Sequence, residues 1–209
     1  MSPDEPQDGF VLPGHESLVA RFAFVDNEAL REELSLVLEY VTFLTQLEKT
    51  LGSRPTIAFS VRKDIVLWTA CIVEATLHHA LCVLQKRGTQ EEKRKLVGLH
   101  PEYKEMKKCW QLPAQEDGYE QNIVCGIQCL VPQSLKGMLF QELIERAGGI
   151  GLFDAEIKRK ATYLRKRRNE LHLQALDTKS VYEKTTITKV FEDAGIILKC
   201  LEERLASIV

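Results

Sequence analysis

The chain has 209 residues, a length typical of one large domain. Its hydrophobic content of 44% is sufficient for a sizeable core. The formal net charge of -2 argues against a protein that simply coats nucleic acid, which would be strongly basic, although net charge does not exclude a local basic patch.

The start of the chain differs in character from the rest. Residues 1–14 contain acidic side chains and three prolines, Pro3, Pro6 and Pro13, whereas a secretory leader has a basic start and an apolar centre. We predict that residues 1–25 form an N-terminal tail, partly disordered, and that residues 26–209 form one helical domain. No apolar run reaches the roughly 20 residues that span a bilayer. We therefore expect a cytoplasmic protein, not bound to membranes, whose six cysteines are reduced.

Two long helices are predicted in the first half of the domain. Apolar residues recur at spacings of three and four from Leu30 to Leu44, with Asp26 as the expected N-cap and an end near Gly52. The next helix opens at Pro55 and runs to about Gly88. Because it is apolar on nearly every face from Ile65 to Leu84, we expect it at the centre of a bundle, and we expect Trp68 to lie in the core.

The middle of the chain has a different pattern. Residues 89–101 are predicted to form a short charged helix or loop. Short strands are expected at Lys108–Leu112 and Asn122–Val131, separated by Pro113 and by Asp117-Gly118. We interpret residues 103–132 as a small β-hairpin inserted between helices.

Three further helices complete the prediction. Ser134 is the expected cap of a helix that ends at Ala147, before Gly148 and Gly149. Asp154 is the expected cap of a helix that continues to His172 or slightly beyond, and Thr185 or Thr186 begins the last one. The predicted fold class is all-α, an antiparallel bundle of four to five helices with the small inserted hairpin.

The helix that ends near His172 contains an unexpected charge. On a helical projection Arg168 falls on the same stripe as Ala161, Leu164 and Leu171, where an apolar residue is expected. Burial of a lone charge is costly, so this arginine needs a carboxylate or phosphate partner. Glu74, in the otherwise apolar central helix, is the internal candidate. We predict an ion pair between Arg168 and Glu74.

The same stretch resembles a known family. Arg-Asn-x-Leu-His at residues 168–172 is similar to the Arg-x(4–6)-His motif of the HEPN domain family, and the run that precedes it is also similar. The helix that carries Glu74, followed by Ala-Thr-Leu, resembles the second helix of that family. In helix order the resemblance covers residues 26–209, and the hairpin resembles an insertion that some members carry.

The resemblance implies an all-α bundle that forms a homodimer by packing its motif helices across a two-fold axis. It also implies that His172 is the catalytic histidine and that Asn169 is the polar residue beside the arginine. The resemblance leaves open which arginine belongs to the motif. Arg167 leaves four residues before His172 and Arg165 leaves six, whereas Arg168 directly precedes Asn169 but leaves only three. Helical geometry favours Arg168 and Arg165 over Arg167.

Many HEPN proteins cleave RNA without metal, which suits these residue types. RNA supplies its own nucleophile, the 2′-hydroxyl, so the protein needs only to assist proton transfer and to stabilise charge on the phosphate. Histidine suits the first task and arginine the second. We therefore expect an endoribonuclease, in the manner of a toxin or defence effector, that cleaves single-stranded RNA to a 2′,3′-cyclic phosphate and needs no cofactor.

Simpler interpretations exist for each feature. Residues 165–168 can be a solvated basic face, with His172 bonding a carbonyl group at the helix terminus. Glu74 and His78 share a helix face at a spacing that metals use, and Cys109 lies near Cys125-x-x-x-Cys129, but neither set offers enough ligands for a metal. The alternative function is a non-catalytic helical module for dimerisation or interaction. A neighbouring antitoxin or nucleotidyltransferase partner would favour the ribonuclease.

Overall fold

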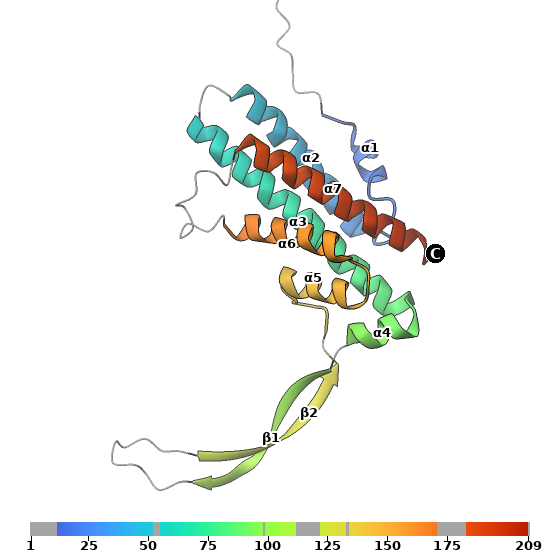
Figure 1. The fold of residues 1–209 in the computed structure, drawn as a ribbon, viewed down its shortest axis with the longest axis vertical. Helices are drawn as coiled ribbons and strands as arrows, with labels where there is room; N and C mark the ends of the chain where they lie inside the picture. The colour runs from blue at the N-terminus through green and yellow to red at the C-terminus, as the bar shows by residue number, and fades with distance from the viewer. Residues whose placement is uncertain are drawn as a thin grey trace, which may run out of the picture.

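The structure is a computed structural model that describes residues 12–51, 55–97, 99–111, 122–132, 134–170 and 183–208. The elements along the described chain are α1 (His15–Ala20), α2 (Glu28–Thr50), α3 (Pro55–Arg87), α4 (Gln90–Val97), β1 (Leu99–Gln111), β2 (Asn122–Pro132), α5 (Phe140–Gly149), α6 (Ala155–Asn169) and α7 (Lys184–Ala206). Helices form the main body, as Figure 1 shows, so the predicted all-α class is confirmed at this level.

Helix α3 is the centre of the bundle, as its apolar sequence predicts. It contacts α2, α4, α5, α6 and α7. Val66, Val73, Leu77, Leu81 and Leu84 of this helix are completely buried. Packing against several neighbouring helices favours apolar side chains along most of this helix, which accounts for its composition.

The same helix is the one element of the described residues that could cross a membrane by length and composition alone. The most apolar 18-residue window within its segment Ile57–Arg87 has a mean hydropathy of 1.5, and 61% of that window is buried inside the fold. Such burial is consistent with the core helix of a soluble protein.

The N-terminal boundary of the domain differs from the prediction. Residues 12–25 were expected in a tail, but α1 packs against α2, and Leu18, Phe22 and Val25 are at most 2% exposed. These three apolar side chains are spaced three and four residues apart, which suits burial against a helix. Residues 1–11 lie outside the described part.

Two predicted helix starts are wrong. Asn27 rather than Asp26 caps α2, because the Asn27 side chain accepts a hydrogen bond from the Leu30 backbone N–H at 3.1 Å. Asp26 instead lies 3.0 Å from Arg87. Helix α5 begins at Phe140, and Ser134 stabilises a turn before it by accepting from the Lys136 N–H at 3.1 Å.

The backbone of β1 and β2 forms a two-stranded antiparallel ladder from Leu99 opposite Pro132 to Gln111 opposite Asn122, with two irregularities. The strands extend away from the helices (Figure 1). The first strand begins well before the predicted start at Lys108. Pro101 is compatible with this because every strand of a two-stranded sheet is an edge strand, where proline is tolerated.

Candidate functional site

Helix α6 carries the basic residues of the motif. Asp154 caps it as predicted, accepting a hydrogen bond from the Ile157 N–H at 2.8 Å. Ala161 and Leu164 are fully buried and fix the orientation of the helix. Its last turn contains Lys166, Arg167 and Arg168, where positive charge is favoured by the helix dipole.

The described part of α6 ends at Asn169, with Glu170 as its C-cap. His172, the predicted catalytic histidine, lies in residues 171–182, outside the described residues. Asn169 is exposed at the end of the helix. The geometry of the site is therefore given by the arginines and their partners.

The predicted ion pair is present. The Arg168 guanidinium donates a hydrogen bond to Oε2 of Glu74. The side chains are 31% and 25% exposed, so water reaches the pair only in part. This contact links the end of α6 to the middle of α3. The Arg168 guanidinium is therefore already paired with a carboxylate.

Arg167 has partners of its own. It lies 2.8 Å from Oε2 of Glu170 and stacks over the Tyr163 ring at 5.0 Å from the centroid. Lys189 of α7 lies 4.9 Å from the same ring centroid. Burial disfavours the charged guanidinium, but Tyr163 and Glu170 outweigh this effect and raise the pKa of Arg167 above its ordinary value. Arg167 thus belongs to the packing between α6 and α7.

Arg165 is different from these two neighbours. It is half-buried, and its Nε, like that of Arg167, is buried without a hydrogen-bond partner among the described residues, so the difference lies in the ion pairs. The ion pairs of the described part include Arg167 and Arg168 but not Arg165. Arg165 precedes Arg168 by three residues, so the two lie one turn apart on neighbouring positions of the helix surface.

A cavity of about 440 Å³ lies beside Glu74. Its wall includes Cys71 and His78 of α3, Met138 before α5, and Leu143 of α5. His78 Nε2 lies 3.2 Å from the Leu135 carbonyl oxygen, so His78 ties α3 to the segment before α5.

The Cys71 thiol in this wall is not activated. Burial raises its pKa, and the positive charge of Arg168 only partly offsets that effect, while Glu74 adds to it. A thiol with a raised pKa is a poor nucleophile at neutral pH. The cavity therefore offers Glu74 and His78 as its polar groups.

Asp193 was not predicted from the sequence. It is only 2% exposed on α7, and it lies 3.1 Å from Lys160 of α6 and 2.9 Å from Lys189. The contact with Lys160 holds α7 beside the motif helix, whereas Lys189 lies on α7 itself, one turn before Asp193. The available signal was an acidic residue in the apolar face of the last helix, the same kind of signal that identified Glu74.

The candidate metal ligands lie partly inside and partly outside the described residues. No group of three or more histidine, cysteine, aspartate or glutamate side chains with metal-binding geometry occurs among the described residues. The side chains of Cys109, Cys125 and Cys129 lie outside that part. Cys71, Cys82 and Cys200 are free thiols.

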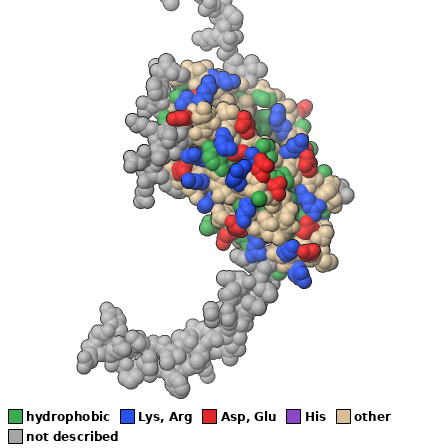
Figure 2. All heavy atoms as spheres, in the orientation of Figure 1, with side chains coloured by type: hydrophobic (Ala, Val, Ile, Leu, Met, Phe, Trp, Pro, Cys, Tyr) green, Lys and Arg blue, Asp and Glu red, His purple; other side chains and the backbone are tan. Residues whose placement is uncertain are grey.

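Charge on the visible face of the helices is mixed rather than of one sign, as Figure 2 shows. This distribution agrees with the balanced composition. Compared with models of protein families, with curated proteins and with solved structures, the chain matches none.

Proposed function

We propose that this chain is a HEPN-like endoribonuclease that cleaves single-stranded RNA without a metal ion. The 2′-hydroxyl attacks the adjacent phosphorus, the bond to the 5′-oxygen breaks, and the products are a 2′,3′-cyclic phosphate and a 5′-hydroxyl end. His172 transfers the proton, and an arginine stabilises the negative charge on the phosphate oxygens.

The observation that supports this proposal most is the difference between the three arginines of α6. Arg167 and Arg168 face carboxylates, whereas Arg165 has no ion-pair partner among the described residues. A phosphate site needs a guanidinium that is held in place but not already neutralised. Six residues separate Arg165 from His172, which is within the family pattern.

We therefore assign the phosphate contact to Arg165 rather than to Arg168, the two arginines that helical geometry favours over Arg167. Arg168 becomes a positioning residue, because its contact with Glu74 fixes the end of α6 against α3. Asn169, exposed at the end of the helix, is available for a hydrogen bond to RNA.

The test uses purified full-length protein with labelled RNA in EDTA. His172→Ala is expected to lower the rate by about 10²–10⁴-fold. Arg165→Ala is expected to lower it by about 10²–10³-fold with an unchanged melting temperature. Arg167→Ala is the matched control on the same helix, and it should retain most of the rate. Cleavage that survives His172→Ala would contradict the proposal, as would an Arg165→Ala variant with full activity.

A second candidate is a non-catalytic dimerisation module. It is favoured by an exposed aromatic pair, Tyr40 of α2 and Trp68 of α3, whose rings meet edge to face with centroids 6.1 Å apart. The side chains are 43% and 36% exposed, against the expectation that Trp68 lies in the core. Exposed aromatic surface is typical of interfaces. A confirmed dimer that cleaves no RNA would favour this candidate.

A further inference from the structure

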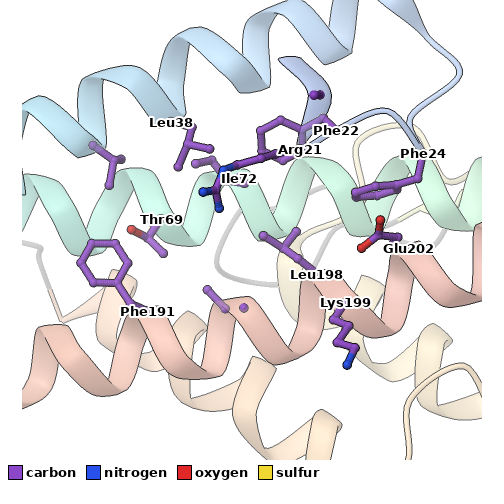
Figure 3. Close-up of a pocket in the computed structure, with 14 residues that line it drawn as sticks. Arg21, Phe22, Phe24, Leu38, Thr69, Ile72, Phe191, Leu198, Lys199 and Glu202 are labelled. Atoms are coloured by element: carbon purple, nitrogen blue, oxygen red, sulfur yellow. The ribbon is translucent and has the colours of Figure 1, made fainter. Parts of the chain in front are cut away.

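A second cavity, on the side of α3 that faces α2 and α7, has a volume of about 530 Å³. Its walls come from the turn after α1, from α2, from α3 and from α7 (Figure 3). No residue of α5 or α6 lines it, so it is separate from the arginine site. Its volume is within the range of about 300–1,000 Å³ that small-molecule sites have.

The cavity is mainly apolar. Phe22 and Ile72 are buried in its wall, and Phe24, Leu38 and Leu198 are partly buried around it. An apolar cavity open to water favours a ligand with an apolar body, because transfer of that body from water is favourable.

Gly195 of α7 is one of the residues that line this cavity. It lies inside helix α7, where glycine costs about 1 kcal/mol relative to alanine. A Cβ atom at this position would meet no atom within 4 Å. A side chain added at this position would therefore extend into open space without a clash.

Arg21 and Thr69 form a polar end of the cavity, whereas Glu202, which also lines it, lies beside Phe24 in Figure 3. Figure 3 shows the Arg21 guanidinium turned towards the part lined by Leu38 and Thr69. The ion pairs of the described residues do not include Arg21. The Thr69 hydroxyl is buried and has no hydrogen-bond partner in the same part of the chain. Lys199 also lines the cavity, but its amino group points away from it in Figure 3.

We propose that this cavity binds a carboxylic acid with an apolar body, of the class of medium-chain fatty acids. The carboxylate contacts Arg21, with Thr69 as a second donor, and the hydrocarbon chain lies among Phe22, Ile72 and Leu198. This site does not depend on the proposed ribonuclease activity, because it shares no residue with the arginine site.

The experiment titrates the full-length protein with decanoate, below its micelle concentration, by calorimetry. Saturable binding of one decanoate per chain is expected, with weaker binding of uncharged decanol. Arg21→Met should weaken decanoate binding by about tenfold to a hundredfold, the value of a hydrogen bond to a charged group. It should leave decanol binding unchanged.

Two further variants separate the site from non-specific effects. Gly195→Leu fills the cavity and should abolish binding while circular dichroism shows an intact fold. Lys199→Met removes a charge at the rim that points away, and should bind decanoate as the natural chain does. The proposal is overturned if decanol and decanoate bind alike in both the natural chain and Arg21→Met, or if Gly195→Leu binds normally.

Discussion

Arg168 of α6 and Glu74 of α3 form an ion pair between two packed helices. Arg168→Met leaves the Glu74 carboxylate without its partner in a half-buried position. We expect a loss of about 1–2 kcal/mol in the free energy of unfolding, below the 3–5 kcal/mol typical of fully buried pairs, because water reaches both groups. Urea unfolding measures this loss. The double variant Glu74→Leu with Arg168→Met should lose less than the sum of the single variants. Additive losses would show that the pair contributes nothing.

That ion pair could be predicted from the sequence because both charges interrupt apolar helical patterns. The choice between the arginines could not, since it depends on which carboxylate each one reaches in space. Glu170 follows Arg167 by three residues and forms an ion pair with it. Helix spacing permits such a pair but does not require it. Asp193 interrupts an apolar face in the same way as Glu74, so the same sequence signal applies to it.

His79 gives a pH dependence at the scale of a single residue. It is 8% exposed, and burial lowers its pKa from 6.5, an effect that Asp26 opposes and that His78, Lys86 and Arg87 reinforce. A histidine whose folded pKa is lowered binds fewer protons in the folded state than in the unfolded state. Its contribution to stability is therefore present above about pH 6.5 and is lost as the pH falls below that value. His79→Gln should flatten the decline in stability between neutral and mildly acidic pH, measured by urea unfolding at several pH values. Equal slopes in both proteins would contradict this assignment.

At the scale of elements, the cap of α6 controls the helix that carries the motif. Asp154→Ala removes the hydrogen bond to the Ile157 N–H and should cost about 1 kcal/mol. The matched control is Ser134→Ala, because Ser134 caps no helix and its loss should stay within about 0.5 kcal/mol. Thermal unfolding of both variants measures these two losses. Equal losses of stability in the two variants would mean that the Asp154 cap does not stabilise α6.

Helix positions were predictable where apolar spacing was long and regular, as in α3 and α7. Helix starts were less so, because adjacent residues such as Asp26 and Asn27 are equally good caps by type, and only the path of the entering chain selects one. The extent of β1 depends on pairing with β2 rather than on its own composition. The sequence before α2 predicts a tail because polar residues separate its three apolar positions, Leu18, Phe22 and Val25, which the fold buries.

At the scale of the whole molecule, we expect a homodimer formed through the face that carries Tyr40 and Trp68. Trp68, Cys71, Ala75 and His78 follow one another at spacings of three and four, so they share one side of α3. The last three line the cavity beside Glu74. An interface on this side would bring the arginine sites of two copies close together, as a two-fold arrangement requires.

Light scattering at micromolar concentration should give twice the mass of the 23.8 kDa chain. Trp68→Glu should shift this mass to one chain without loss of helix, because a charge cannot be buried unpaired at an interface. Ile196→Glu is the matched control, since Ile196 is an apolar residue on α7 that is 44% exposed. If Ile196→Glu dissociates the dimer and Trp68→Glu does not, the interface lies on α7 instead. If Trp68→Glu yields a folded monomer that still cleaves RNA at full rate, one copy suffices for catalysis, and two His172 residues need not share a cleft.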